Sequence, residues 1–353
     1  MRRLCVLSLL GPAVLGGCSV PGTEAGGPCN QHDVCVAGLT CDVVQHTCVS
    51  SEKIRWESVP TTVSVTLRAV WGISEDDLVA VGDQGTVIRY RTGDLQWHRD
   101  TDAMAKAKGK SLYAVWGRGN ELWAAGSSVV LHFDGTSWSD ELVHEGTTNL
   151  TSFTFRAVAG SATETWAVGD GSASSSSAPQ VFKRASDRWL TVPDANLSDF
   201  SGRDLAVVDG SVVLVGSYAK QTPVFNGSTW TSTAIDTTQS QVSLKAVWGL
   251  KATDLWAAGS ALFHTDGGPW QAIAGKDQPS SIDDIWGTAN GDFYMVSETS
   301  YASDAYHCTA TGSCFPVSVD ETVHGFLGVW CSDTGSTVVV VGDDGLAFRR
   351  VTQ

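Results

Sequence analysis

Short apolar runs separated by turn residues follow one another along residues 51–353, without the 3.6-residue period of an amphipathic helix. One run recurs as Ala-Val-Trp-Gly or a close relative, and two copies have lost the tryptophan. The seven copies occupy residues 69–72, 114–117, 157–160, 206–209, 246–249, 284–287 and 328–331. Their third positions lie 38 to 49 residues apart. This period indicates repeated four-stranded units.

Each unit continues with a second apolar run, such as residues 78–82, and then a third run that ends in a turn and a tryptophan, such as residues 131–138. Asp-Gly or Asn-Gly pairs stand before several of these tryptophans. Such pairs tolerate the positive φ of tight hairpin turns. Four short strands separated by turns are typical of one propeller blade.

The seventh unit lacks its outer strand, because the chain ends soon after the third run at residues 346–349. Residues 54–59, which precede the first unit, have the character of an outer strand. If they pair with the last strand, the ring closes and only short outer edges stay unpaired. We therefore predict an all-β fold, a seven-bladed β-propeller over residues 51–353 closed by an N-terminal outer strand.

The first residues have the pattern of an export signal. Arg2 and Arg3 precede an apolar run that extends from Cys5 to Leu15. This run is too short to span a bilayer as a transmembrane helix.

The sequence Leu-Gly-Gly-Cys at 15–18 resembles the lipobox of bacterial lipoproteins, in which the cysteine becomes the first residue and carries acyl chains. The resemblance implies removal of residues 1–17, lipidation of Cys18 and a flexible tether over residues 18–28. Ser19 after the cysteine implies the outer membrane, so we expect an exported protein that is anchored in the cell envelope at the periplasmic face or the cell surface. A plain signal peptide with a chance cysteine is the alternative.

Export places the remaining cysteines in an oxidising compartment. Cys29, Cys35, Cys41 and Cys48 lie in residues 29–50, a segment too poor in apolar residues to fold on its own core. We predict a small module with two disulfides, and the spacing leaves all three connectivities open. A zinc site is the alternative, although the Cys-x2-Cys pairs of metal knuckles are absent. The module resembles short cysteine-rich modules of the Dickkopf N-terminal type through Gly-Leu-Thr-Cys at 38–41.

Three cysteines belong to the propeller. Cys308 and Cys314 flank a five-residue turn in the sixth unit, which lacks an outer tryptophan. A cross-strand disulfide between them would compensate for the missing ring. Cys331 replaces the glycine of the repeat and is predicted to be a buried thiol.

The composition fits a large core. The chain has 353 residues, of which 42% are hydrophobic and 17% charged, and this excludes wholesale disorder. The net charge of -15 argues against nucleic acid as a partner. All 14 tryptophans fall on inner, second or outer strands of the predicted blades, so they indicate blade packing rather than an aromatic ligand cage.

The repeats resemble those of propeller lipoproteins with Val-Trp-Gly and Trp-Ala-Val-Gly motifs, which are abundant in myxobacteria-like genomes. Residues 263–270 resemble repeats of photosystem II assembly-factor-like propellers and approximate the Asp-box of sialidases, without its spacer between Asp and Gly. The resemblance implies the fold and carries little about activity.

The longest connections fall on one face of the predicted disc, where second strands lead to third strands and outer strands lead to the next blade. These connections are residues 140–154, 170–180, 194–203, 217–223 and 298–305. Loops on a rigid scaffold commonly carry recognition, so this is our candidate binding face, with Tyr218, Tyr301 and Tyr306 as candidate contacts. Drift of tolerated surface loops is the alternative.

Charged residues precede several inner strands at one strand parity: Arg68, Arg156, Lys245 and Asp283. They could line the central channel, although solvated strand ends explain them as well. His132, His264 and His307 occupy matching positions in different blades, which favours repeated packing over a shared metal.

The sequence lacks the motifs of common catalytic sites, and its arginines show no placement that marks the convergent cluster of a sialidase. We therefore expect no catalytic residues, no metal and no cofactor. The favoured function is a membrane-anchored, monomeric, non-catalytic binding scaffold for an unknown protein or glycan. The alternative is a polysaccharide hydrolase or lyase with a site at the central channel.

Overall fold

The computed structural model describes residues 27–29, 39–42, 47–50, 54–175, 179–193, 197, 200–217, 220–237, 242–273, 281–298, 305–317, 319 and 325–352. The predicted signal peptide, the lipidation site Cys18 and Cys35 lie outside these residues. The chain forms two compact units, Met1–Ile54 and Arg55–Gln353. No helix among the described residues is long and apolar enough to cross a membrane.

In the first unit, β1 (Leu39–Asp42) and β2 (Thr47–Ser50) form an antiparallel hairpin in which Cys41 lies opposite Cys48. Cys29 is bonded to Cys41, and this selects one of the three possible connectivities. Cys48 also belongs to a disulfide. Both strands of the hairpin thus contain a disulfide-bonded cysteine, in keeping with a disulfide-rich module that has little apolar core of its own.

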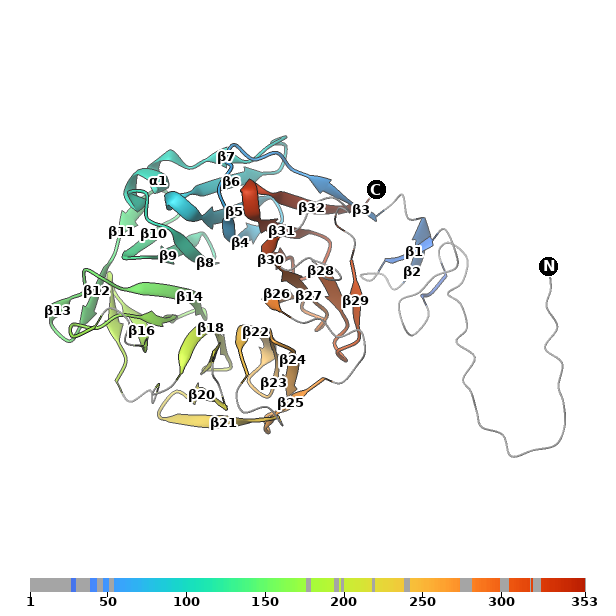
Figure 1. Cartoon of the computed structure of the whole chain (residues 1–353). Helices are drawn as coiled ribbons and strands as arrows, with labels where there is room; N and C mark the ends of the chain where they lie inside the picture. Colours follow the sequence, from blue (N-terminus) through green and yellow to red (C-terminus); the bar gives the residue numbers. More distant parts are fainter. Residues whose placement is uncertain are drawn as a thin grey trace, which may run out of the picture. The chain divides into compact units, whose positions relative to one another are not determined.

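The second unit is a propeller whose blades are arranged around a central axis (Figure 1), each with strands in order from the inside outward. Blade 1 comprises β4 (Leu67–Ser74), β5 (Asp77–Gly82), β6 (Val87–Arg91) and β7 (His98–Arg99). Blade 2 comprises β8 (Leu112–Arg118), β9 (Glu121–Gly126), β10 (Val129–Phe133) and β11 (Trp138–Asp140). Blade 3 comprises β14 (Thr154–Gly160), β15 (Thr165–Asp170), β16 (Pro179–Ala185) and β17 (Arg188–Thr191). Blade 4 comprises β18 (Ser201–Val208), β19 (Ser211–Ser217), β20 (Gln221–Phe225) and β21 (Trp230–Asp236).

The remaining blades complete the ring. Blade 5 comprises β22 (Leu244–Lys251), β23 (Asp254–Gly259), β24 (Leu262–Thr265) and β25 (Trp270–Ala272). Blade 6 comprises β26 (Ile282–Gly287), β27 (Phe293–Ser297), β28 (Ala305–Cys308) and β29 (Cys314–Pro316). Blade 7 comprises β30 (Phe326–Cys331), β31 (Val338–Gly342), β32 (Ala347–Thr352) and, as its outer strand, β3 (Ile54–Ser58). Short 3-10 turns, η1 (Asp83–Gly85) and η2 (Asp343–Gly345), follow β5 and β31.

The predicted closure of the ring is confirmed. The strand β3 lies next to β32 in the sheet order β3-β32-β31-β30, and the backbone N–H of Val59 donates to the carbonyl of Ala347 at 2.9 Å. The outer strand of the last blade therefore comes from before the first blade, which removes an unpaired strand edge.

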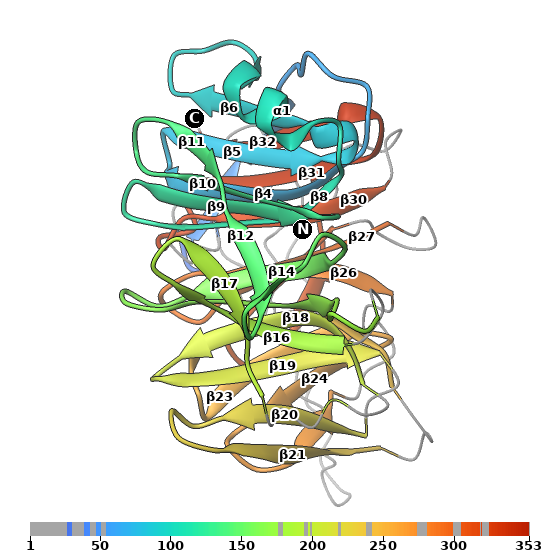
Figure 2. The same cartoon turned by 90° about the vertical axis from the view of Figure 1, so that its left-hand side faces the viewer.

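Two additions were not predicted. The helix α1 (Thr101–Ala107) follows blade 1, where Asp100 caps it by accepting from the N–H of Ala103. At seven residues it is too short to produce a visible helical period. The hairpin of β12 (Leu142–Glu145) and β13 (Thr148–Asn149) links blade 2 to blade 3, and β12 pairs in parallel with β17 (Figure 2).

The Trp-Gly pair of the repeat joins neighbouring blades. A Cβ added at Gly160, Gly287 or Gly72 would lie only 2.6, 2.4 or 2.3 Å from the indole of the preceding blade. Trp116, Trp248 and Trp330 thus occupy the space that the next blade's glycine leaves free.

Blade 7 has Cys331 where the other tryptophan-containing copies have glycine, and Cys331 is a buried free thiol as predicted. The indole of Trp286 in blade 6 therefore lies differently. It meets Trp71 of blade 1 edge-on with 5.1 Å between ring centroids, and its Nε1 donates to the carbonyl of Cys331 at 3.2 Å.

Blade 6 has no outer tryptophan. A disulfide joins Cys308 to Cys314, which face each other across β28 and β29. In other blades the corresponding space is filled by indoles such as Trp97, Trp189 and Trp270, each no more than 1% exposed.

Candidate functional site

Every inner strand has a β-bulge at the same place. In each blade the register with the second strand shifts by one residue, for example between Leu67 and Ala69 in blade 1. A bulge leaves one residue unpaired and redirects its side chain. We call the seven bulged residues the mouth ring: Arg68, Tyr113, Arg156, Arg203, Lys245, Asp283 and Leu327.

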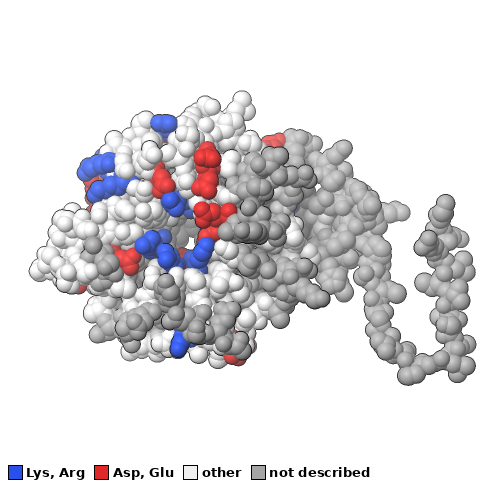
Figure 3. Space-filling view, viewed as in Figure 1, with Lys and Arg blue, Asp and Glu red and all other residues white. Residues whose placement is uncertain are grey.

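The mouth ring surrounds one cavity. All seven residues line a space of about 520 Å³ together with Ser217, Ser243 and Glu298. Figure 3 shows Lys and Arg side chains gathered around the central opening, with Asp and Glu side chains beside them. The mouth ring lies near the start of each inner strand, where the connection from the preceding blade arrives. It therefore belongs to the face that the long connections were predicted to form.

The channel continues below the ring as a space of about 210 Å³. Its wall contains the residue two places after each bulge, and this residue is aliphatic in every blade. The wall residues are Val70, Val115, Val158, Leu205, Val247, Ile285 and Val329. One position further along the strands, the indoles of Trp71, Trp116 and Trp286 line the channel. We call the mouth and this channel the cup, with a charged rim, an aliphatic wall and an aromatic inner end.

A second set of polar residues stands beside the mouth ring, at the end of the second strand of each blade. We call it the second ring: Asp83, Ser127, Asp170, Ser217, Ser260, Glu298 and Asp343. Where this position is aspartate and the mouth residue is arginine, the two pair. The Nε and Nη2 of Arg68 donate to the two oxygens of the Asp83 carboxylate at 2.7 and 2.8 Å, and this pairing holds the pKa of Asp83 below its usual value.

Two other rim cations also have carboxylate partners. Arg156 lies 3.2 Å from Asp170 in the same blade. Lys245 has a serine in its own second strand and instead reaches Asp283 of blade 6, with 2.5 Å between Nζ and Oδ1.

Arg203 of blade 4 is different. Its second-ring neighbour is Ser217, and the Nε of Arg203 donates to the Ser217 hydroxyl at 3.2 Å. Among the described residues no carboxylate pairs with this guanidinium. In the neighbouring blade the Nε of Arg156 is buried without a hydrogen-bond partner. Blades 3 and 4 therefore hold the donors of the rim that are least satisfied within the described chain.

Two carboxyl groups line the channel wall one residue after the bulge, where the other blades have alanine or glycine. Asp204 accepts from its neighbour Leu205 and from the N–H of Val247 in blade 5, both at 2.8 Å. Asp284 accepts in the same way from Ile285 and from Val329 in blade 7, both at 2.8 Å. Each side chain thus bonds its blade to the next one.

These two carboxyls are half-buried in the channel wall. Desolvation raises the pKa of Asp204 to about 7. Desolvation, with a smaller contribution from the nearby charge of Asp204, raises the pKa of Asp284 to about 8.

Several sequence expectations can be compared with this geometry. Arg68, Arg156, Lys245 and Asp283 do line the mouth of the channel. The arginines show no placement in the sequence that marks a convergent cluster, whereas in the fold Arg68, Arg156 and Arg203 line the same cavity. The blade 4 repeat was assigned to residues 206–209, whereas strand register makes residues 204–207 equivalent to 69–72. This shift of two residues hid Arg203 and Asp204.

The candidate tyrosines do not define the site. Tyr218 and Tyr301 lie outside the described residues. Tyr306 lies in β28, where it is 5% exposed and packs in the core with Trp256 and Met295, so it is not available on a binding face. All four residues of β28 are buried.

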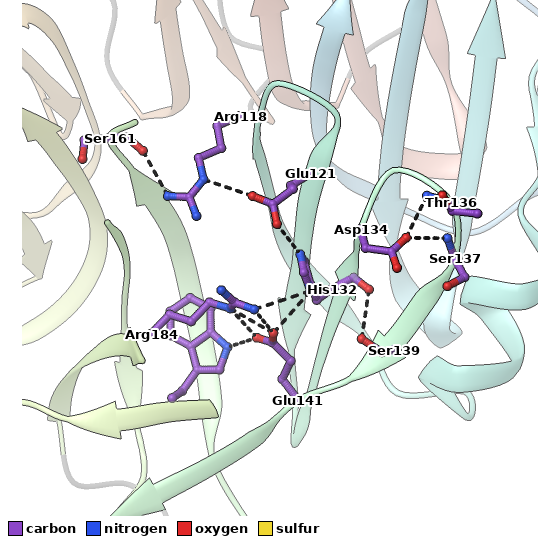
Figure 4. Close-up of polar contacts among 11 residues, drawn as sticks. Arg118, Glu121, His132, Asp134, Thr136, Ser137, Ser139, Glu141, Ser161 and Arg184 are labelled. Carbon is purple, nitrogen blue, oxygen red and sulfur yellow. Dashed lines mark hydrogen bonds and ion pairs between the residues drawn. The ribbon is translucent and has the colours of Figure 1, made fainter. Parts of the chain in front are cut away.

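The histidines have packing roles. His132, His264 and His307 pack against the aromatic side chain of the adjacent second strand, with ring centroids 4.8, 4.3 and 4.9 Å apart, and the first of these pairs is stacked while the other two are tilted. Figure 4 shows His132 between the carboxylates of Glu121 and Glu141. No group of three or more His, Cys, Asp or Glu among the described residues could hold a metal ion.

Tyr113 in the mouth ring lines the cavity, and a sialidase would use a tyrosine as its nucleophile. Its hydroxyl lies 3.1 Å from that of Ser127, and the Arg68 guanidinium lies 5.4 Å from its ring centroid. Within the described chain its hydroxyl has this serine, and no carboxylate, as hydrogen-bond partner. The arrangement lacks the carboxylate that would activate a tyrosine.

No family model and no curated protein matches this chain. Solved structures do match it. The structure of YCF48 bound to a D1 peptide has a TM-score of 0.63 and 17% identity, over 84% of this chain and 96% of that one. YCF48 from Cyanidioschyzon merolae gives 0.61 and 17%, over 84% and 99%. The WD40 β-propeller domain of Doa1 gives 0.61 and 12%, over 84% and 96%. At these identities the likeness shows the propeller fold.

Proposed function

We propose that this protein is a non-catalytic binding propeller that captures a protein or glycan partner in the cup. The observation that carries the proposal is the mouth ring, in which seven equivalent bulges direct one side chain from every blade to one cavity. These side chains differ from blade to blade, whereas the wall residues below them are uniformly aliphatic. Uniform positions reflect packing, and varied positions on a rigid frame are suited to recognition.

The solved relatives lend support to a binding role. The YCF48 structure contains a D1 peptide, so a propeller of this architecture can hold a peptide ligand. The acidic balance of the chain, with a net charge of -15, disfavours nucleic acid as the partner.

We also propose that the protein is anchored to the cell envelope, at the outer membrane, through acyl chains on Cys18. The support is the export signal with its Leu-Gly-Gly-Cys sequence at 15–18. A tethered, monomeric propeller would present its cup to partners in the periplasm or at the cell surface. Labelling with a radioactive fatty acid, lost in Cys18→Ala, tests the anchor.

The binding role can be tested with a rim variant of the full chain that carries Arg156→Gln, Arg203→Gln and Lys245→Gln. Its matched control, Arg91→Gln, Arg188→Gln and Lys251→Gln, removes the same charge from exposed positions elsewhere. In crosslinking to envelope fractions followed by mass spectrometry, we expect the rim variant to lose partners that the control keeps. Equal partner sets for both variants would contradict a role of the cup.

One observation favours the alternative, an enzyme that acts on polysaccharide. Arg68, Arg156 and Arg203 converge on a cavity that also contains Tyr113. Incubation of the full chain with acidic oligosaccharides and analysis of the products by mass spectrometry separates the two functions. A binding propeller returns the sugars unchanged, whereas release of shorter sugars would establish the enzyme.

A further inference from the structure

We propose that the cup binds the terminal residue of a glycan that carries a single carboxylate, and that Arg203 binds this carboxylate. The inference rests on the proposed function and names the ligand class. It depends on the charge arrangement around the rim and on the indoles at the inner end of the channel.

Arg203 is the rim cation best placed to receive an external anion. The guanidinium of Arg68 is held by both oxygens of Asp83, and Lys245 is held by Asp283. Arg203 makes one hydrogen bond, to the neutral Ser217 hydroxyl, among the described residues. A guanidinium binds a carboxylate through two parallel hydrogen bonds, and the nitrogens not used by Ser217 are free to do so.

Arg156 is the second guanidinium on this side of the rim. Its buried Nε has no hydrogen-bond partner within the described chain, although its guanidinium also contacts Asp170. Arg156 and Arg203 occupy equivalent bulges in adjacent blades and line the same cavity. An anion between blades 3 and 4 would therefore meet two guanidinium groups, only one of which has a carboxylate partner.

The balance of charge limits how many carboxylates the ligand has. The mouth ring has four cations and the single acid Asp283. The second ring adds four acids, namely Asp83, Asp170, Glu298 and Asp343. The rim as a whole is close to neutral and the chain is acidic, so a polyanion such as an acidic peptide run or a sulfated glycan gains little attraction. One carboxylate directed to Arg203 avoids this repulsion.

The other rim groups suit sugar hydroxyls. Ser217 and Ser243, whose hydroxyls lie 3.1 Å apart, border the cavity on the side of Arg203. Asp283 and Glu298 line the same cavity and can accept from hydroxyl donors. The indoles at the inner end of the channel narrow the space beneath the rim, so the cup accommodates a chain end better than the middle of a polymer.

The test is calorimetric titration of the full chain with methyl β-D-glucuronide and with the methyl glycoside of N-acetylneuraminic acid, each compared with methyl β-D-glucoside. We expect at least one acidic sugar to bind, and the neutral sugar to bind about ten-fold more weakly or not at all. Arg203→Gln should weaken binding of the acidic sugar by about ten-fold or more, because it removes the charge-assisted pair.

Two further variants keep the result interpretable. Arg203→Lys retains the charge without the planar fork and should give an intermediate loss, which a folding defect would not produce. Arg188→Gln removes an exposed arginine paired with Asp187 and should bind as the wild type does. Thermal melting of each variant confirms that it is folded.

The proposal is overturned if no acidic sugar binds, if the neutral sugar binds equally well, or if Arg203→Gln binds as tightly as the wild type. It is also overturned if an acidic peptide, such as acetyl-Gly-Asp-Gly-Asp-amide, binds through Arg203 while the sugars do not. In that case, or if the rim variant still loses its partners, the cup binds a partner other than the sugar. If neither the sugars nor the peptide bind and the rim variant keeps its partners, the proposed function itself is rejected.

Discussion

Single side chains with buried charge contribute to blade contacts at some distance from the channel. Glu141, which follows the outer strand of blade 2, is 8% exposed and accepts from Arg184 and from the indole of Trp189, both in blade 3. The Arg184 guanidinium also lies 5.1 Å from the ring of Trp123 (Figure 4 shows the polar contacts). Desolvation of such an ion pair is costly, and the several hydrogen bonds to the carboxylate offset it.

Replacing this carboxylate should be strongly destabilising. In Glu141→Ala, the half-buried Arg184 guanidinium and the buried Trp189 N–H would lose their partner, with a cost of about 3 kcal/mol. Urea unfolding followed by tryptophan fluorescence measures the change. Glu121→Ala is the matched control, because Glu121 is 38% exposed and also contacts His132. Its cost should stay below about 1 kcal/mol. Similar losses in both variants would contradict this account of the network.

The inner strand of each blade both holds neighbouring blades together and supplies the residues of the candidate site. Its bulge directs one residue to the rim, and the following residues form the channel wall and the contact with the next blade. In blades 4 and 6 the residue after the bulge is an aspartate, which bonds to the inner strand of the following blade. These bonds explain why carboxyl groups are retained in the desolvated channel wall.

The channel carboxyls predict how stability depends on pH. Their pKa values rise from 3.8 in the unfolded chain to about 7 for Asp204 and about 8 for Asp284 in the folded protein. Between these values the folded state retains protons that the unfolded state has released. Their contribution to the free energy of unfolding is therefore full below pH 4 and is lost as the pH rises through 7 and 8.

Urea unfolding at pH 5 and at pH 8.5 should show this loss, and the difference should shrink in Asp204→Asn with Asp284→Asn. The double variant keeps one acceptor oxygen at each site, but it has no carboxyl group that titrates at these two positions. The assignment would be contradicted if the free energy of unfolding of the wild type did not fall between pH 5 and pH 8.5, or if it changed by the same amount in the wild type and in the double variant. The exposed pair Asp76→Asn and Asp266→Asn serves as the control and should leave the pH dependence unchanged.

At the scale of the whole molecule, the repeat made the architecture predictable and left part of the site hidden. The Trp-Gly pairs recur because each indole needs the space above the next blade's glycine, so their period counts blades. The strand before the first blade, β3, supplied the outer strand that the seventh repeat lacks. Blade 4 has lost its tryptophan, and an apolar run such as 205–208 fits two registers equally well. Arg203 and Asp204 therefore could not be placed from the sequence.

The meeting of the rim residues around one axis also cannot be read from local sequence patterns. Residues about 40 positions apart meet at the rim only because seven inner strands start at the same level of one ring. Strand parity placed Arg68, Arg156, Lys245 and Asp283, but it did not indicate that their strands bulge. Two of the ion pairs at the rim form within blades 1 and 3, where they depend on the residue at the end of the second strand, and the third joins Lys245 of blade 5 to Asp283 of blade 6.

Closure of this ring should depend on β3. A chain that lacks residues 1–58 loses the outer strand of blade 7 and leaves the backbone groups of β32 unpaired, whereas a chain that lacks residues 1–50 keeps it. We expect the shorter chain to be less stable by at least about 3 kcal/mol, because several backbone hydrogen bonds and the packing of Trp56 are lost. Thermal unfolding followed by circular dichroism compares the two.

A synthetic peptide of residues 51–60 supplies the matching test of mechanism. If the defect is the missing strand, the peptide should bind the shorter chain, raise its melting temperature and have no effect on the longer chain, whose site is already occupied. A scrambled peptide of the same composition is the control. Equal stability of the two chains, or no response of the shorter chain to the peptide, would show that the propeller does not rely on this strand for closure.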